Sequence, residues 1–261
     1  MQYSTFAAID IGSYDVILEI FEISKKQGIR SVDKICHRME LGKDTYTLGK
    51  IRPEMEEELC RVLADFVRIM EGYRVDAYRA MASSAISEAA NSLYVLGKIR
   101  QLTGLSVTVL SNSEQRFLGY KALAAMEDNF NKIIEKGTAI LDLDGGSFQI
   151  SLFDKDALVT TQNIRMGSLR VRERLAGIQS ETEHYEEMVE ELIWNEVSSF
   201  KKMYLKDRKI ENIMLIGDVF TDSVYQNIEE KTTKIISREN FNTWYEKTIR
   251  QSPMELAVKL G

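Results

Sequence analysis

The sequence contains few of the residues that build sites from covalent or metal bonds. Its 261 residues include 2 Cys, 2 His and 2 Pro. Two cysteines cannot form a disulfide-rich scaffold, and Cys36, Cys60, His37 and His184 do not have the spacing of the common structural zinc patterns. Cys36 lies in a strand-like segment and Cys60 in a helix-like one. We therefore predict that both are buried apolar groups and not reactive thiols.

Long apolar runs and an excess of basic residues are also missing. No run approaches the roughly 18 apolar residues of a membrane-spanning helix, and no signal peptide opens the chain. We therefore expect a cytoplasmic protein with no membrane partner. Lys plus Arg number 34 against 40 Asp plus Glu, a formal net charge of −6. This balance argues against a protein that coats nucleic acid.

What the chain does contain is a repeated segment. Residues 6–22 and 139–154 each read as an apolar strand that ends in Asp, a turn with Gly and Ser, and a second strand of alternating pattern. The turns are Asp10-Ile-Gly-Ser13 and Asp142-Leu-Asp-Gly-Gly-Ser147. The duplication indicates two related α/β halves.

The hydrophobic pattern predicts a similar order of elements in both halves. In the first half we expect strands at about 4–11, 15–24 and 30–41, a helix from Pro53 to about Tyr73, a strand at 75–81, a helix at 84–103 and a strand at 106–110. A helix from Ser111 towards Met126 leads into the second half.

In the second half we expect strands near 138–143, 148–154 and 157–166, a helix at about 181–204, a strand at 212–217 and a helix from Ser237 to about Arg250. Phe200 and Met203 are expected on the buried side of the long helix. Three meandering strands followed by alternating helices and strands, twice over, predict an α/β fold with two lobes. We divide them at residues 1–125 and 126–261.

The two turns carry groups that suit a phosphate ligand. Gly lets backbone amides approach phosphate oxygens closely, and Ser adds a hydroxyl donor. Asp at the strand end can hold a divalent cation or orient a water. Each turn alone is equally compatible with an ordinary hairpin. Two such turns facing each other across a cleft could clamp a phosphate chain.

Five segments occur in a characteristic order: Asp10–Ser13, Ala82–Asn91, Leu110–Gln115, Asp142–Ser147 and Arg165–Arg170. In this order they resemble the exopolyphosphatase/guanosine pentaphosphate phosphohydrolase (Ppx/GppA) family, and the resemblance covers almost the whole chain. It implies two ribonuclease H-like, actin-like lobes with mixed sheets flanked by helices and a cleft between them. It also implies hydrolysis of terminal phosphoanhydride bonds, with Mg²⁺, in inorganic polyphosphate or guanosine pentaphosphate.

Matched motif by motif, the resemblance assigns three sets of site residues. Those at catalytic positions are Glu114, Gln115 and Gln149. Those expected to bind phosphate are Gly12, Ser13, Ser87, Gly145, Gly146, Ser147, Arg165 and Arg170. Those expected to hold Mg²⁺ are Asp10, Asp142 and Asp144.

The chain departs from the family pattern where charge matters. Ser87 stands where the family has an Arg that contacts phosphate, and Gln115 where it has the second of two glutamates, which resembles the catalytic base. The other departures are Tyr14, Asp15, Asp144, Gln149 and Asp218. An amide cannot accept a proton from water near neutral pH, and loss of a general base costs about 10²–10⁴ in rate.

Glu114 is the neighbouring carboxylate that could replace the missing base. It is also the last residue of Ser111-Asn-Ser-Glu114, a capping-box pattern that predicts a carboxylate folded back onto the helix start. The sequence is compatible with either arrangement.

Three functions fit these observations. The first is a phosphohydrolase of the family type, and the second is a non-catalytic relative that binds a phosphorylated ligand or partner. The third, an actin-like ATPase or sugar kinase, is disfavoured because Ile216-Gly217-Asp218 lacks a Gly-Gly turn. The sequence leaves open whether the chain forms a homodimer and whether the second lobe continues past Gly261.

Overall fold

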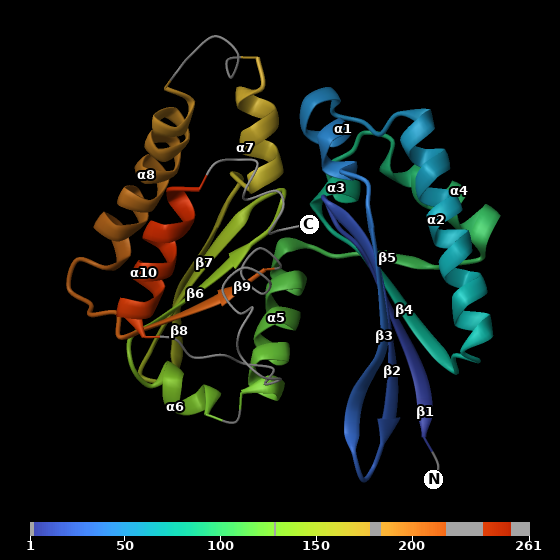
Figure 1. Cartoon of the computed structure of the whole chain (residues 1–261), viewed down its shortest axis with the longest axis horizontal. Coiled ribbons are helices and arrows are strands. Elements are labelled where there is room, and N and C mark those ends of the chain that lie inside the picture. The colour runs from blue at the N-terminus through green and yellow to red at the C-terminus, as the bar shows by residue number, and fades with distance from the viewer. Residues whose placement is uncertain (1–2, 128, 178–183, 218–236, 252–261) are drawn as a thin grey trace. The chain divides into compact units, whose positions relative to one another are not determined.

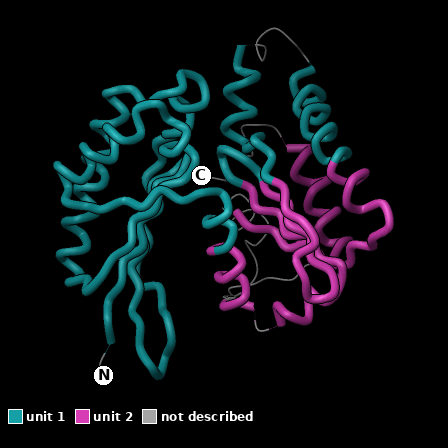
Figure 2. The backbone as a smooth tube through the Cα atoms, turned by 180° about the vertical axis from the view of Figure 1, so that it is seen from behind, with its two compact units in different colours: residues 1–117, 144–148, 163–199 teal, residues 118–143, 149–162, 200–261 magenta. Residues whose placement is uncertain are grey.

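The computed structural model describes residues 3–127, 129–177, 184–217 and 237–251 (Figure 1). Helices alternate along the chain with strands that form two β-sheets, as the sequence predicts. The chain divides into two compact units (Figure 2). Unit 1 comprises Met1–Phe117, Asp144–Phe148 and Asn163–Ser199, and unit 2 comprises Leu118–Leu143, Gln149–Gln162 and Phe200–Gly261. The predicted lobe boundary at residues 125 and 126 stays a prediction.

Unit 1 is built on a five-stranded mixed sheet with the order β3-β2-β1-β4-β5. Its strands are β1 (Ser4–Ile11), β2 (Asp15–Ser24), β3 (Gly28–Arg38), β4 (Ala77–Ala82) and β5 (Val107–Val109). The first three form an antiparallel meander, whereas β4 and β5 run parallel to β1. The carboxyl ends of β1 and β4 therefore lie at the same edge, where Asp10 is paired with Met81.

The helices of the first part of unit 1 bury one side against this sheet. They are α1 (Leu41–Leu48), α2 (Pro53–Gly72), α3 (Ser84–Ser87) and α4 (Ser92–Thr103), and α7 (Ser168–Leu175) follows later in the chain. Pro53 begins α2 at a position where a backbone N–H would have no partner within the helix, so the lack of an N–H in proline costs nothing there. The apolar stripe of α2, with Leu59, Leu63 and Phe66, packs into the same core as Ile9 and Leu18 of the sheet.

Three parts of unit 1 differ from the sequence prediction, and one of them is α7, which the sequence analysis did not predict. The predicted helix at 84–103 is interrupted between Ser87 and Ser92, so that α3 and α4 are separate. The predicted strand at 30–41 ends at Arg38, and the chain turns through Glu40 (φ 48°) into α1, which the sequence analysis missed. A non-glycine residue rarely adopts this left-handed conformation, so the pattern of apolar residues did not indicate a break there.

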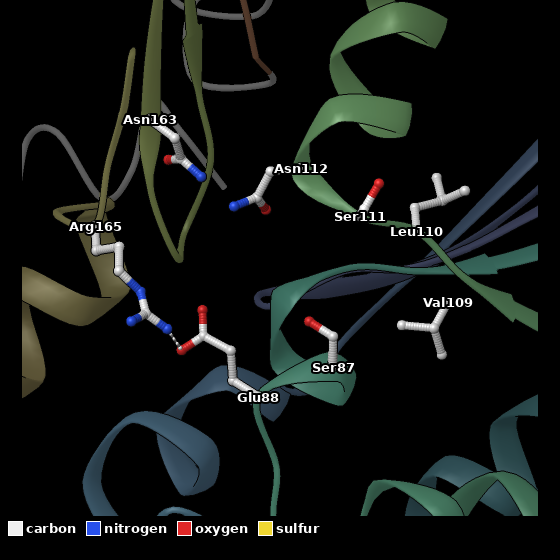
Figure 3. Close-up of a pocket in the computed structure, with 8 residues that line it drawn as sticks. All are labelled: Ser87, Glu88, Val109, Leu110, Ser111, Asn112, Asn163 and Arg165. Carbon is white, nitrogen blue, oxygen red and sulfur yellow. Dashed lines mark ion pairs between the residues drawn. The ribbon is translucent and has the colours of Figure 1, made fainter.

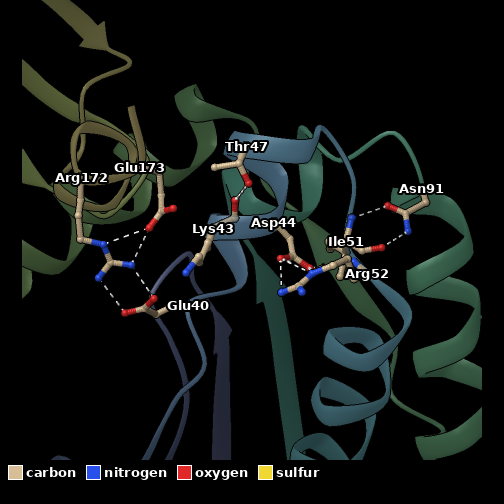
Figure 4. Close-up of polar contacts among 9 residues, drawn as sticks. All are labelled: Glu40, Lys43, Asp44, Thr47, Ile51, Arg52, Asn91, Arg172 and Glu173. Carbon is tan, nitrogen blue, oxygen red and sulfur yellow. Dashed lines mark hydrogen bonds and ion pairs between the residues drawn. The ribbon is translucent and has the colours of Figure 1, made fainter. Parts of the chain in front are cut away.

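Polar side chains, of which Asp44 and Glu56 are buried, connect these helices (Figure 4). Asp44 of α1 accepts hydrogen bonds from the backbone N–H and the Nε of Arg52, at 2.9 Å each. Asn91, in the break between α3 and α4, exchanges hydrogen bonds with the backbone of Ile51 and donates to Glu56 of α2. The interruption is therefore held by side-chain contacts to α2 and to the segment before it.

Unit 2 contains most of a four-stranded sheet with the order β8-β7-β6-β9. Its strands are β6 (Thr138–Leu143), β7 (Phe148–Asp154), β8 (Ala157–Ile164) and β9 (Asn212–Ile216). Helices α6 (Phe130–Ile134) and α10 (Arg238–Ile249) belong to unit 2, whereas α5 (Asn112–Met126) and α8 (Tyr185–Tyr204) are divided between the two units after Phe117 and Ser199. A core of Phe130, Ile134, Ile140 and Phe153 joins α6 to the sheet.

The predicted α/β class and the predicted strands are confirmed, with bounds that shift by a few residues. Two burial predictions are wrong. Cys36 is exposed because its side of β3 is uncovered, whereas Cys60 is buried, and burial raises the pKa of its thiol. Met203 is 58% exposed, while Phe200 on the same helix is buried. In the described part of the chain, no helix combines the length and apolar character needed to cross a membrane.

Candidate functional site

The first Gly/Ser turn, between β1 and β2, is closed by backbone hydrogen bonds. The N–H of Gly12 donates to the carbonyl of Asp15 at 2.9 Å, and the N–H of Gly42 donates to the carbonyl of Ser13 at 2.8 Å. The start of α1 therefore packs directly on this turn. Asp10, the residue predicted to bind metal, is exposed at the end of β1.

Ser13 belongs to a cluster of three hydroxyl groups. Its Oγ lies 2.6 Å from the Tyr46 hydroxyl, which lies 2.9 Å from Oγ of Ser84. Ser13 is fully buried, and burial raises the pKa of Tyr46. The hydroxyl of Ser13, predicted to contact phosphate, is here engaged within the protein.

The second Gly/Ser turn, residues 144–148, packs in unit 1 against this hydroxyl cluster. Oδ1 of Asp144 accepts a hydrogen bond from the N–H of Gly145 at 2.6 Å, and the N–H of Asp144 donates to the carbonyl of Ser147. A Cβ atom at Gly146 would lie 2.1 Å from the Tyr46 hydroxyl. Only glycine permits this approach, which explains the residue type without a ligand.

Gly167 also permits a close approach, on the other side of this turn. A Cβ atom there would lie 2.3 Å from the carbonyl oxygen of Asp144. The N–H of Ser168, at the start of α7, donates to that same oxygen. The Arg165–Arg170 segment is thereby fixed to the second turn.

Arg165 and Arg170 converge on one carboxylate that the sequence analysis did not select, Glu88. Their Nη2 atoms lie 2.6 and 3.0 Å from its Oε2 atom. Burial raises the pKa of Glu88, but hydrogen bonds from the two arginines lower it by more, so its carboxyl is ionised at neutral pH. Arg170 also donates to the carbonyl of Gly146, and its guanidinium lies 3.8 Å from the Tyr46 ring centroid.

A pocket of about 630 Å³ opens beside this ion pair (Figure 3). Its lining residues come from the segment after β4, from β5 and the start of α5, and from the end of β8. They are Ser87, Glu88, Val109, Leu110, Ser111, Asn112, Asn163 and Arg165. Hydroxyl, amide and guanidinium groups dominate the polar part of this lining. Ser87 and Arg165, which were both predicted to bind phosphate, thus line the same pocket.

The start of α5 contains the two residues at the predicted base position. The N–H of Ser111 donates to Oε2 of Glu114 at 2.9 Å, its hydroxyl donates to the same oxygen at 2.7 Å, and the N–H of Glu114 donates back to Ser111 Oγ at 3.3 Å. These bonds confirm the capping box, and they lower the pKa of Glu114. Gln115 follows on α5, half-buried.

The remaining predicted residues belong to unit 2 or lie outside the described chain. Asp142 is half-buried at the end of β6, and Gln149 is buried on β7. Oε1 of Gln149 has no hydrogen-bond partner among the described residues. Asp218 lies outside the described residues. In the described ranges, no three His, Cys, Asp or Glu side chains gather closely enough to hold a metal.

A second Arg–Glu pair fixes α7 to α1 within unit 1 (Figure 4). Arg172 donates to both carboxylate oxygens of Glu40, at 2.9 and 2.6 Å, and also to Glu173. The hydrogen bond from Arg172 is the main cause that lowers the pKa of Glu40. The strained backbone at Glu40 is thus held by a bidentate ion pair.

The two sheets with their helices, and the turn repeated at the start of each, place the chain among α/β proteins of the actin-like fold. A profile of the Ppx/GppA phosphatase family matches residues 19–259. The chain therefore belongs to the Ppx/GppA phosphatase family.

Curated relatives are distant and longer. A bifunctional 3-dehydroquinate synthase/phosphatase of Fusobacterium nucleatum is 21% identical over 238 residues, which are 86% of this chain and 34% of that protein. Exopolyphosphatase 1 of Mycobacterium leprae is 26% identical over 144 residues, 55% of this chain and 41% of that protein. The chain thus spans between a third and about two fifths of the length of these relatives.

Solved structures match over most of the chain. A Ppx/GppA protein of Aquifex aeolicus has a TM-score of 0.70 at 21% identity, over 94% of this chain and 79% of that one. An exopolyphosphatase of Cytophaga hutchinsonii has a TM-score of 0.71 at 18% identity, over 97% of this chain and 82% of that one. These similarities confirm the predicted fold.

Sequence reasoning missed Glu88, Tyr46, Ser84, Asn112 and Asn163. Glu88 and Ser84 lie inside the Ala82–Asn91 segment that was singled out, and Asn112 inside Leu110–Gln115. For Tyr46 and Asn163 no local pattern gave a signal, because their roles depend on contacts between segments far apart in the chain.

Proposed function

We propose that this chain binds a phosphate polyanion, either inorganic polyphosphate or a phosphorylated guanosine nucleotide, with little turnover. The observation that carries this proposal is the start of α5. The position that resembles the family's catalytic base holds an amide, Gln115, and the adjacent carboxylate of Glu114 is engaged by Ser111. A base that gives up two hydrogen bonds before it can accept a proton is a poor one.

The binding half of the proposal is supported by the groups around the pocket. Arg165 and Arg170 present guanidinium donors, which match phosphate oxygens in geometry. Ser87, Ser111 and two asparagines add neutral donors in the same lining. The net charge of −6 does not oppose this, because local donors hold an anion and the total charge acts mainly at long range.

Mg²⁺ belongs to the proposal as a companion of the phosphate ligand. Asp10, Asp142 and Asp144 are the carboxylates predicted for it, and Asp10 is exposed at a strand end. Mg²⁺ commonly binds through one or two carboxylates plus water and substrate phosphates, so a cluster of three protein ligands is not required. When bound, the ion would neutralise part of the phosphate charge.

The second candidate is Mg²⁺-dependent hydrolysis of a terminal phosphoanhydride bond. Family membership favours it, as do the named activities of the mycobacterial exopolyphosphatases and of the Fusobacterium phosphatase. The Asp residues at both strand ends are retained in this sequence. In this case Glu114 would leave the capping box when substrate binds.

One experiment separates the two candidates. Phosphate release from long-chain polyphosphate and from guanosine pentaphosphate is measured with Mg²⁺, and tripolyphosphate binding is measured by calorimetry on the same sample. We expect binding with little or no release. Turnover of about one per second or faster contradicts the non-catalytic proposal, and absence of binding contradicts both candidates.

Gln115→Glu tests the missing base directly. Restoring a carboxylate at this position should raise a weak release rate by about tenfold or more, because a positioned base contributes about 10²–10⁴. Gln101→Glu on α4 adds the same charge at an exposed position and serves as the control. Equal rates of phosphate release in the two variants would show that the amide at position 115 is not the cause of weak catalysis.

A further inference from the structure

Both arginines beside the pocket are already paired with a carboxylate of this chain. The Nη2 atoms of Arg165 and Arg170 lie 2.6 and 3.0 Å from the same oxygen, Oε2 of Glu88. Figure 3 shows the Glu88 carboxylate facing Arg165 in the pocket lining. Guanidinium groups hold phosphate and carboxylate oxygens through the same donors. Glu88 thus occupies the position at which these arginines would meet an anionic ligand.

The backbone of Glu88 is fixed, whereas its side chain can rotate. Its N–H donates to the carbonyl of Ser84 at 3.0 Å, and the flanking residues Ile86 and Ala89 are buried in the core. The Glu88 side chain remains 26% exposed. A change of rotamer would therefore move the carboxylate off the arginines without moving β4 or α4.

The two arginines differ in how firmly they are held. Arg170 is 21% exposed, lies over the Tyr46 ring and donates to the Gly146 carbonyl. Arg165 is 65% exposed. An incoming anion would therefore take Arg165 from Glu88 first, while Arg170 remains in place as a fixed donor.

We infer that Glu88 competes with the ligand for Arg165 and Arg170 and thereby sets the affinity of this pocket for phosphate groups. This inference rests on the proposed function and adds a specificity-determining residue to it. A phosphoryl group must either displace the Glu88 carboxylate or share the arginines with a like charge, and both weaken binding. The competition favours phosphoryl groups, which carry more charge than a carboxylate.

The test compares tripolyphosphate binding by calorimetry at low salt in the unmodified chain, Glu88→Gln and Glu22→Gln. We expect Glu88→Gln to bind about tenfold more tightly, which corresponds to about 1.4 kcal/mol. Glu22→Gln should change the Kd by less than about twofold, since a partly exposed charge far from the ligand is screened.

Glu22 is a close match for Glu88 as a control. Its side chain is 27% exposed and pairs with one arginine, Arg30, so the substitution removes the same charge from an Arg–Glu ion pair of similar exposure. It lies near the hairpin end of β2, where Ser24 pairs with Gly28, at the opposite end of the strand from Asp15. Thermal melting of each variant confirms that it is folded, and Glu88→Ala replaces Glu88→Gln if the latter is not.

Arg165→Gln distinguishes competition from a general charge effect. If Glu88 competes for Arg165, the gain from removing Glu88 should shrink to less than about threefold in the Arg165→Gln background. A gain that persists unchanged there overturns the inference. So does unchanged or weaker binding by the Glu88 variants while the unmodified chain binds, and this outcome leaves the proposed function intact. If neither the unmodified chain nor any variant binds tripolyphosphate, the proposed function is contradicted, and so is the inference that rests on it.

Discussion

Tyr46 is the residue at which the separate sequence segments of unit 1 meet. Its hydroxyl contacts Ser13 and Ser84, and its ring packs under Arg170. The nearest approach is to Gly146, where a Cβ atom would lie 2.1 Å from the hydroxyl. The packing of the second turn against Tyr46 therefore depends on the absence of a side chain at position 146.

Gly146→Ala should destabilise the chain by about 1–3 kcal/mol, the usual cost of overpacking. Tyr46→Phe alone should cost about 1–2 kcal/mol because the buried hydroxyl of Ser13 and the half-buried hydroxyl of Ser84 lose a partner. The double variant should lose less than the sum, since removing the hydroxyl relieves the closest contact of the methyl group, although Ser84 Oγ at 2.5 Å remains. Urea unfolding measures all three.

Gly97→Ala is the control for these substitutions. Gly97 lies within α4, and nothing lies within 4 Å of a Cβ atom built there. This variant should gain about 0.5–1 kcal/mol, because Ala favours a helix more than Gly does. Equal effects at positions 97 and 146 would contradict the steric account.

Ser111 holds the carboxylate that could serve as a base. Ser111→Ala removes the hydroxyl bond to Glu114, so the pKa of Glu114 should rise towards its ordinary value. Carbon-13 NMR titration of the carboxyl group measures this shift. Ser113→Ala, which removes a hydroxyl bonded to Arg116 instead, should leave the pKa unchanged. Phosphate release by Ser111→Ala would show that the capping box had restrained Glu114.

At the scale of elements, the turn between β7 and β8 is the clearest mismatch of residue and backbone. Its two residues, Lys155 and Asp156, have φ of 51° and 61°. Consecutive left-handed residues define a type I′ hairpin turn, which Asn-Gly fits best. Their N–H groups donate to the carbonyls of Glu135 and Ile134, so the turn also anchors the end of α6.

Replacing Lys155-Asp156 with Asn-Gly should stabilise the chain by about 1 kcal/mol, since it removes the left-handed strain and keeps both N–H donors. Replacing the same pair with Pro-Gly should destabilise it, because Pro removes the N–H at position 155 and cannot take a positive φ. Midpoints of thermal unfolding compare the two. A lower midpoint for Asn-Gly would show that these side chains contribute contacts of their own.

At the scale of the whole molecule, paired carboxylates link stability to pH. Hydrogen bonds from Arg172 lower the pKa of Glu40; at Glu88, burial raises the pKa and bonds from Arg165 and Arg170 outweigh it. Because the pKa of these carboxyls is lower in the folded state, the unfolded chain binds more protons than the folded chain in acid, and acid therefore favours unfolding. The stabilisation is complete above the ordinary pKa of about 4.3 and is lost as the pH falls through the folded-state values.

The urea midpoint should therefore fall as the pH is lowered from 6 towards about 3. The double variant Glu40→Gln, Glu88→Gln should start lower at pH 6 and decline less, because it has no such protons to gain. Parallel curves for the two proteins would mean that other carboxylates dominate. Glu22→Gln again supplies the matched substitution outside the turns.

Much of the architecture could be predicted from local pattern. The α2 helix follows from Pro53 and an apolar stripe, and the β1–β2 hairpin from alternation around a Gly turn. The break before Ser92 could not be predicted, because Asn91 holds the segment between α3 and α4 through its bonds to Ile51 and Glu56. The left-handed Glu40 was missed for a similar reason: its partner, Arg172, lies far along the chain.

By itself, the sequence determined the α/β class, the repeated Asp-Gly-Ser turns, the Ppx/GppA resemblance and the amide at position 115. These depend on residue type and spacing, which act locally. Three features follow only from the packed chain: Ser13 is buried against Tyr46, the capping box between Ser111 and Glu114 is formed, and Glu88 pairs with both arginines. Hydrogen bonds and ion pairs depend on distances of a few ångströms between segments, and those distances exist only once the chain has packed.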